Sequence, residues 1–182
     1  MIHPWKITKS EVTAQTSIFT LKTLNAHSPG NQRSHKFYVL EAGDWVNVIP
    51  ITADGRVIMV RQYRHGTGEV TLEIPGGLID PGQTPIQSAK RELLEETGFS
   101  GGDWELLGRT RPNPAFLNNW CYCYLARDVV RTAEQDLDEA EELEVVTADL
   151  KDVPGLIARG EIDHSLVLSA FFYFQRNHQF TM

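Results

Sequence analysis

Cysteine is rare in this chain, because only Cys121 and Cys123 occur among its 182 residues. Two positions apart on a strand, they would face the same side, and a disulfide between them would be strained. A Cys-x-Cys pair alone is also a weak metal motif. We therefore expect two free thiols in a strand and a cytoplasmic protein rather than a disulfide-stabilised secreted domain.

Long apolar runs and an excess of positive charge are both missing. No run approaches the roughly 18 apolar residues of a membrane span, and the first six residues lack the charged-then-apolar order of a signal peptide. Lysines and arginines number 17 against 24 aspartates and glutamates, which gives a net charge of −7. We therefore expect neither a membrane nor a nucleic acid as partner. A nucleotide substrate stays compatible, because a bound metal can supply positive charge locally.

Several motifs of catalytic and metal sites are absent as well. The six histidines include no His-x-x-x-His pair, which argues against a histidine-based zinc site. The sequence contains no Gly-x-Ser-x-Gly elbow and no Walker-type glycine loop. Serine-nucleophile and P-loop chemistry therefore find no support.

The length and a hydrophobic content of 41% suit one domain with a small extension. Residues 6–41 alternate between apolar and polar, which predicts two or three antiparallel strands with an exposed connection at 25–34. Such a small sheet buries little by itself, so we expect it to pack on the main domain or on a second subunit. We accordingly divide the chain into a β extension, 1–42, and a main domain, 43–182.

A hairpin opens the main domain. Two β-branched runs, 46–51 and 57–62, flank Asp54-Gly55, which is a strong turn signal. The second run leads to Arg61 and Arg64, which are either phosphate-binding residues at a strand end or ordinary surface arginines. A further strand, 70–75, delivers Glu73 to a glycine loop.

An amphipathic helix follows that loop. Thr84 is a good N-cap, Pro85 fits the first helical position, Gln87 completes a capping box, and Gly98 ends the helix. An apolar stripe at helical spacing is expected to face the core, and its members are Ile86, Ala89, Leu93 and Leu94.

Carboxylates crowd the second half of this helix. Glu92 and Glu96 form an i,i+4 pair, with Glu95 beside them. Like charges stacked in this way repel, and acidic groups near a helix C-terminus oppose the dipole. The group is either a solvated acidic face or a site for a hard divalent cation such as Mg²⁺, which is held by a few carboxylates plus substrate phosphates.

The rest of the chain reads as two strands, an acidic segment, a strand and two helices. The loop 111–119 carries Phe116 and is either a binding loop or a proline-stiffened connection. The acidic run 134–144 could swing a carboxylate toward a metal. The expected strands are 104–109, 120–126 and 143–147, and the expected helices are 149–159 and 164–175, the last capped by Asp163 or Ser165.

The glycine loop and its helix resemble the Nudix box, Gly-x5-Glu-x7-Arg-Glu-U-x-Glu-Glu-x-Gly-U, where U is a bulky apolar residue. Gln83 departs from the pattern, because it stands where the box has its first glutamate. The matching residues are Gly77, Arg91, Glu92, Leu93, Glu95, Glu96, Gly98 and Phe99. Three further stretches, 61–64, 72–77 and 137–146, resemble ADP-ribose pyrophosphatases and related nucleoside diphosphate sugar hydrolases.

This resemblance implies an α/β/α sandwich with a mixed sheet and an N-terminal antiparallel extension. It implies Mg²⁺-dependent hydrolysis, with Mn²⁺ as a substitute, of the pyrophosphate in ADP-ribose or in a related sugar such as GDP-mannose. It also implies a homodimer that exchanges its N-terminal sheets. The alternatives are a non-catalytic nucleotide-sugar sensor and a housecleaning nucleoside triphosphate pyrophosphatase.

The resemblance also assigns roles to residues. Metal ligands would be Glu92 and Glu96, with Glu95 and the carbonyl of Gly76 in support, while Arg91 orients the carboxylates. Glu141, or else Glu139, would act as general base or further ligand. Substrate contacts would come from Arg64, Arg61, Glu73, Phe116 and an aromatic residue of the extension, Trp5 or Phe19.

Overall fold

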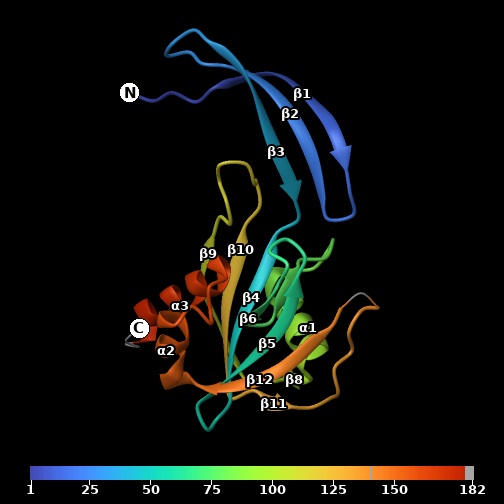
Figure 1. Ribbon diagram of the computed structural model, residues 1–182, viewed down its shortest axis with the longest axis vertical. Coiled ribbons are helices and arrows are strands. Elements are labelled where there is room, and N and C mark those ends of the chain that lie inside the picture. Colours follow the sequence, from blue (N-terminus) through green and yellow to red (C-terminus); the bar gives the residue numbers. More distant parts are fainter. Residues whose placement is uncertain (140, 179–182) are drawn as a thin grey trace. The chain divides into compact units, whose positions relative to one another are not determined.

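The structure, a computed structural model, describes residues 1–139 and 141–178, which divide into two compact units (Figure 1). The first unit contains residues 1–43 and 111–120, and the second contains residues 44–110 and the chain from 121 onward. Residues 111–120, which we assigned to the main domain from the sequence, therefore cluster with the N-terminal strands.

A three-stranded antiparallel sheet forms the first unit. Its order is β1 (Lys6–Gln15), β2 (Phe19–His27) and β3 (Ser34–Ala42). The loop 111–120 lies along β3, where Leu40 N–H donates to the carbonyl of Phe116 at 2.8 Å and Ala42 N–H donates to Asn118 at 3.2 Å. Every residue of β1 is exposed. The antiparallel extension is confirmed, with little core of its own.

The described part of the second unit is built on a seven-stranded mixed sheet. Its path is β12–β5–β4–β10–β9, with β6 beside β5 and β7 beside β4. The β4–β10 pair is parallel and the other pairs are antiparallel. The bounds are β4 (Trp45–Ile51), β5 (Arg56–Arg64), β6 (Glu69–Glu73), β7 (Gly76–Leu78), β9 (Asp103–Thr110), β10 (Cys121–Arg127) and β12 (Leu143–Asp149); β8 (Phe99–Ser100) and β11 (Val130–Arg131) form a separate ribbon.

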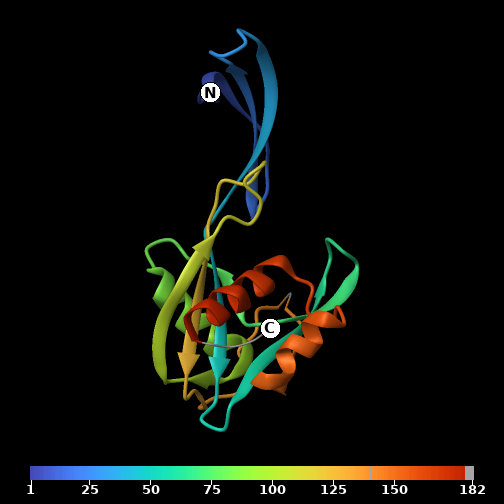
Figure 2. The same cartoon turned by 90° about the vertical axis from the view of Figure 1, so that its left-hand side faces the viewer.

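Helices cover both faces of this sheet, because its central strands carry apolar side chains on both sides. Val46 and Val48 pack toward α1 (Pro85–Thr97), while Ile49 and Ile51 pack toward the opposite face. That face is covered by α2 (Val153–Ala158), preceded by the turn η1 (Leu150–Asp152), and by α3 (Ser165–His178). Figures 1 and 2 show α1 and α3 on opposite sides of the sheet. The predicted α/β/α sandwich is confirmed.

The two ends of α1 follow the sequence signals. Gln87 accepts hydrogen bonds from the N–H and hydroxyl of Thr84, each at 2.8 Å. Gly98 adopts φ 74°, a left-handed conformation that favours glycine, and its N–H bonds to Leu94. The predicted stripe is right for Ile86, Ala89 and Leu93, whereas Leu94 is exposed.

Two smaller predictions have clear outcomes. Cys121 and Cys123 are buried free thiols on β10, as expected, and the hydrogen bond between them, together with burial, raises the pKa of Cys121. The predicted cap of α3 was wrong by one residue, because the cap is His164. Its Nδ1 accepts from Leu166 N–H at 3.3 Å and its carbonyl accepts from Leu168 N–H.

No helix within residues 1–139 and 141–178 is long and apolar enough to cross a membrane.

Candidate active site

The centre of the site is the junction of β7 with α1. Glu92 and Glu96, one turn apart on α1, expose only 8% and 5% of their surface. A solvated acidic face would leave both carboxylates in water, so this alternative is excluded. Two neighbouring carboxylates buried in this way destabilise the fold when charged, because burying a charge is costly unless an opposite charge pairs with it.

Glycines allow the loop to lie against these carboxylates. Gly76 donates its N–H to Glu96 Oε2 at 3.0 Å. A Cβ at Gly77 would stand 2.3 Å from Glu92 Oε1, closer than any side chain can approach. The loop therefore encloses both carboxylates only because it has no side chains at these two positions.

Burial changes the acidity of both carboxyls. It raises the pKa of Glu96 from its ordinary value of 4.5 to about 8, and the nearby charge of Glu92 adds to the rise. Burial likewise raises the pKa of Glu92 to about 7, against the opposing attraction of Arg91. The charged forms of these two carboxyls thus lack sufficient positive charge around them.

Arg91 organises one side of this site. Its Nη2 contacts Glu92 Oε1 at 2.9 Å and the carbonyl of Leu78 at 3.2 Å, while Nη1 donates to Glu95 Oε2 at 2.7 Å. Asp80 adds an ion pair with Nη2 at 3.1 Å. The structure gives Glu95 this contact with Arg91. Asp80 was not among the residues selected from the sequence, because it belongs to a loop without periodic spacing.

A second charged group lies where β5 and β6 pair. Arg64 donates through Nε and Nη2 to the two oxygens of Glu73, at 2.7 and 2.8 Å, and Thr71 donates to the same carboxylate at 2.6 Å. Burial tends to raise the pKa of Glu73, but the hydrogen bonds from Arg64 and Thr71 and the influence of His164 lower it overall. Thr71 and His164 were not anticipated from the sequence.

One candidate of the acidic run 134–144 influences the buried carboxylates through its charge. The charge of Glu141 contributes, after burial, to the raised pKa values of Glu92 and Glu96, and it also favours the charged form of Arg64. In the part of the chain that the structure describes, Glu139 is exposed and its charge is not among the strongest influences on these groups. The electrostatic influence of Glu141 on Glu92 and Glu96 thus favours it over Glu139 as the candidate.

The remaining selected residues have other contacts or belong to the first unit. Arg61 forms an exposed cross-strand pair with Glu144 at 3.3 Å. Trp5 and Phe116 belong to the first unit, where both are exposed and Trp5 packs edge-on against Phe37 at 5.2 Å. Gln83 accepts a hydrogen bond from the buried Ser88 hydroxyl at 2.7 Å, which ties the loop to α1.

The donor set suits a hard divalent cation. Among the described residues, no three acidic, histidine or cysteine side chains converge as a complete metal cage. Two buried carboxylates with raised pKa values nevertheless call for a cation, and Mg²⁺ commonly takes one or two carboxylates and completes its shell with waters and substrate phosphates. The residues present therefore fit such an ion.

The raised pKa of Glu96 predicts a pH dependence for the metal-free protein. Between pH 4.5 and about 8 this carboxyl is protonated when folded and ionised when unfolded, so unfolding releases a proton and stability falls as pH rises. Glu96→Gln should weaken this dependence and stabilise the metal-free protein at pH 7 by on the order of 1–3 kcal/mol. Urea unfolding in EDTA across this pH range measures the effect, and a variant less stable than wild type at pH 7 would contradict it.

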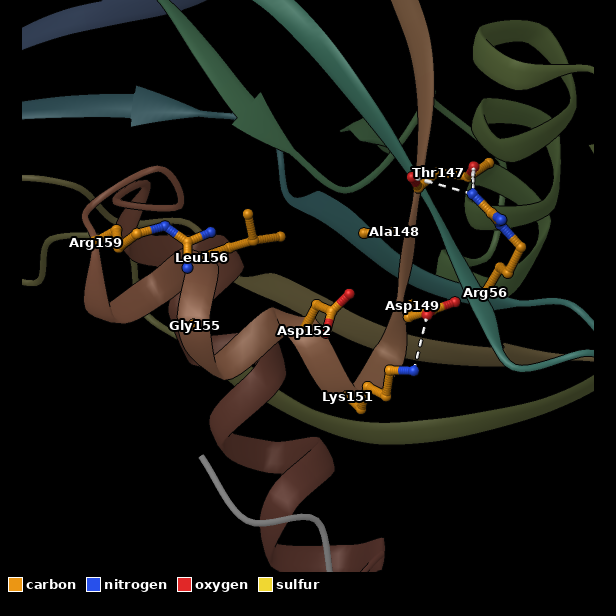
Figure 3. A pocket seen from close by; sticks show the side chains of 9 residues that line it. All are labelled: Arg56, Thr147, Ala148, Asp149, Lys151, Asp152, Gly155, Leu156 and Arg159. Carbon is orange, nitrogen blue, oxygen red and sulfur yellow. Dashed lines mark hydrogen bonds and ion pairs between the residues drawn. The ribbon is translucent and has the colours of Figure 1, made fainter.

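A cavity of about 520 Å³ lies at the C-terminal end of β12, the end farther from the acidic run (Figure 3). Arg56, Lys151 and Arg159 line it together with Asp149 and Asp152. All three cations already have partners. Lys151 pairs with Asp149 at 3.1 Å, Arg159 pairs with Glu161 at 2.7 Å, and Arg56 Nη2 donates to Thr147. None of the carboxylates on α1 lines this cavity.

Comparison with known proteins gives concordant results. A NUDIX domain model matches residues 43–171. The ADP-ribose pyrophosphatase of Bacillus subtilis is 27% identical over 93% of this chain and 95% of its own length. The methanol dehydrogenase activator of Bacillus methanolicus is 29% identical over 93% and 92%. A crystal structure of an ADP compounds hydrolase superposes with a TM-score of 0.86 and 25% identity, covering 98% of this chain and 96% of its own. The chain therefore belongs to the NUDIX domain family.

Proposed function

We propose that this protein hydrolyses the pyrophosphate of ADP-ribose, or of a related nucleoside diphosphate sugar such as GDP-mannose, to a nucleoside monophosphate and a sugar phosphate. The observation that carries the proposal is the pair Glu92 and Glu96, buried under a glycine loop in a NUDIX domain. The similarity to an ADP-ribose pyrophosphatase and to an ADP compounds hydrolase supports the substrate class.

Nudix hydrolases generally need divalent metal ions. We propose Mg²⁺, with Mn²⁺ able to substitute, held by Glu92 and Glu96 with Glu95 and the carbonyl of Gly76 in support. When bound, such an ion neutralises phosphate charge and lowers the pKa of water. Arg91 contributes by holding Glu92 in place, since its guanidinium is itself fixed by Glu95 and Asp80.

Further residues act on the substrate or on the attacking water. Arg64 uses Nε and Nη2 for Glu73, so its Nη1 can donate to a phosphate oxygen from a guanidinium that is already oriented. Glu141 is the proposed general base, which accepts a proton from the attacking water, and Glu139 is the second candidate. Arg61 could add long-range attraction for a phosphate group from its exposed position.

We propose that the extension, residues 1–42, forms a homodimer and that residues 43–182 form the hydrolase domain. The support is the exposed β1 strand and the exposed aromatic side chains of Trp5 and Phe37, which a second copy would bury. Trp5 or Phe19 of the extension would stack on the nucleobase, and Phe116 would be a further substrate contact. The two unbridged cysteines are in keeping with a cytoplasmic location.

The dimer has a direct test. Light scattering after size exclusion should give twice the chain mass of 20.5 kDa at micromolar concentration. The double substitution Trp5→Ser and Phe37→Ser should shift the protein toward the monomer, because it removes apolar area from the exposed face. A wild-type protein that runs as a monomer throughout would contradict the proposal.

A substrate panel tests the reaction. The protein is incubated with Mg²⁺ and ADP-ribose, GDP-mannose, other nucleotide sugars, dinucleoside polyphosphates or nucleoside triphosphates, and the products are identified. We expect a nucleoside monophosphate and a sugar phosphate from at least one nucleotide sugar. Preferential cleavage of triphosphates would indicate a housecleaning enzyme, and binding without turnover would indicate a sensor; either result would overturn the proposal.

The glutamine at position 83 leads to a prediction about the number of metal ions bound per chain. It keeps the hydrogen bond with Ser88 but lacks the charge of the glutamate that the Nudix box has at this position. We therefore expect Gln83→Glu to bind one more Mn²⁺ per chain than wild type, with the fold unchanged. Mn²⁺ titration followed by electron paramagnetic resonance gives the count, and equal counts in both proteins would disprove this expectation.

A further inference from the structure

The side chain of Gln135 forms hydrogen bonds at two points that hold the acidic segment, the acidic run 134–144 named above. Its Nε2 donates to the carbonyl of Glu96 at 2.7 Å and to the carbonyl of Leu143 at 3.4 Å. Glu96 lies in the last turn of α1, and Leu143 is the first residue of β12. One half-buried amide thus connects the start of the segment both to its end and to the helix that carries the buried carboxylates.

Backbone contacts extend this attachment. Asp136 N–H donates to the carbonyl of Glu95 at 2.9 Å, while Thr132 and Ala133 donate to the carbonyl of Gly98 at 2.8 and 3.1 Å. These bonds satisfy carbonyls that the end of α1 would otherwise leave unpaired. Hydrogen bonds therefore hold the chain along the end of α1 up to residue 136. Residue 143 is held in turn by its hydrogen bond with Gln135.

Glu141 lies between these two attachment points. Among the described residues, its hydrogen bonds are with Asp138, whose carbonyl accepts from Glu141 N–H at 2.9 Å and whose N–H donates to Glu141 Oε2 at 3.4 Å. Both contacts lie within the segment, so they do not position it relative to α1. The distance between the carboxylate of Glu141 and those of Glu92 and Glu96 therefore depends on how the ends of the segment are held.

We propose that Gln135 is a positioning residue for the hydrolytic reaction, which holds Glu141 beside the carboxylates of α1 by clamping the two ends of the acidic segment. This inference rests on the proposed function, because it assumes that Glu141 acts on the substrate. Gln135 itself contacts two backbone carbonyls and touches no reacting group. The sequence alone carries no signal for it, since one glutamine in an acidic run has no characteristic spacing.

A double-mutant cycle separates positioning from general stability. Gln135→Met removes both donors at nearly constant size and should lower kcat about tenfold, because small misplacements of a catalytic group are costly. In the background of Glu141→Gln, the same substitution should change kcat less than about twofold, since the group it positions is already inactive. Gln135→Lys returns a donor to the two carbonyls and should recover kcat to within about threefold of wild type.

Amide hydrogen exchange in the metal-free protein gives a readout independent of turnover. In Gln135→Met the amides of Asp136 and Glu141 should exchange faster, because the segment opens locally more often. Glu134→Gln is the matched control. It changes the neighbouring residue, which pairs with the exposed Arg131 at 2.6 Å, and should leave both exchange and kcat unchanged.

The outcomes distinguish a failure of the role proposed for Gln135 from a failure of the proposed function. Equal losses of kcat in the wild-type and Glu141→Gln backgrounds, or unchanged exchange in Gln135→Met, would overturn the role of Gln135. A wild-type protein without activity on any nucleotide sugar would overturn the proposed function instead. In that case faster exchange in Gln135→Met would still support the clamp, and unchanged exchange would still refute it.

Discussion

The double variant Glu92→Gln, Glu96→Gln should lose turnover of nucleotide sugars by at least about a thousandfold, since a catalytic cation contributes several kcal/mol to the transition state. The amide side chains keep the shape of the glutamates and can still accept the N–H of Gly76, but they lack the charge that a cation requires. Initial rates at saturating Mg²⁺, with products identified, measure the loss.

The fold of this double variant should persist, and the metal-free protein should become more stable than wild type. Neutral groups replace two carboxylates whose pKa values burial raises to about 7 and about 8, so the cost of charge burial disappears. Circular dichroism and thermal unfolding in EDTA check this. Glu161→Gln, which changes an exposed partner of Arg159, is the control and should keep full activity. Near wild-type turnover in the double variant would refute the metal assignment.

Gly76→Ala should destabilise the fold by about 1–3 kcal/mol or more, the range for a side chain forced into occupied space. A Cβ at this position would stand 2.2 Å from the carbonyl oxygen of Val46 and 2.6 Å from Asn47 Oδ1. The first of these is backbone of the central strand β4, which pairs with β7 and cannot move independently. Urea unfolding of the metal-free protein gives the free energy directly.

Gly77→Ala should reduce turnover strongly and stability only slightly. Its Cβ would meet the side chain of Glu92 at 2.3 Å, and a side chain can rotate away at smaller cost than backbone. We expect a small loss of stability but a fall in turnover of about a hundredfold, because a displaced Glu92 no longer faces Glu96. Gly66→Ala, where an added Cβ meets nothing within 4 Å, is the control for both substitutions. A stable Gly76→Ala variant and a fully active Gly77→Ala variant would contradict this account of the loop.

Periodicity predicted the local elements well, because hydrophobic spacing and capping residues act over a few positions. The hairpin at Asp54-Gly55, the start of α1 at Thr84 and Pro85 and its end at Gly98 lie where the sequence indicated. Two local predictions were less accurate. Leu94 is exposed, since the apolar face of α1 is narrower than the sequence suggested, and α3 is capped by the imidazole of His164 rather than by an aspartate or serine.

Contacts between distant residues account for what could not be predicted. The sequence paired Glu92 with Glu96 by their spacing, but it did not show that these two are buried while Glu95 pairs with Arg91. The preference for Glu141 over Glu139 likewise depends on how the acidic segment lies along the end of α1. Residues 111–120 pair with β3, from which about 70 residues separate them, so no local pattern announces the pairing.

The sequence by itself determined that this protein has a glycine loop followed by a capped, carboxylate-rich helix, and the spacing of that motif determined its family. The tertiary structure decided which carboxylates are buried and therefore carry raised pKa values, and which arginine is fixed by which acid. The physical reason is that spacing along a helix sets only which side chains share a face. Desolvation and ion pairing depend on the strand and the loop that fold against that face.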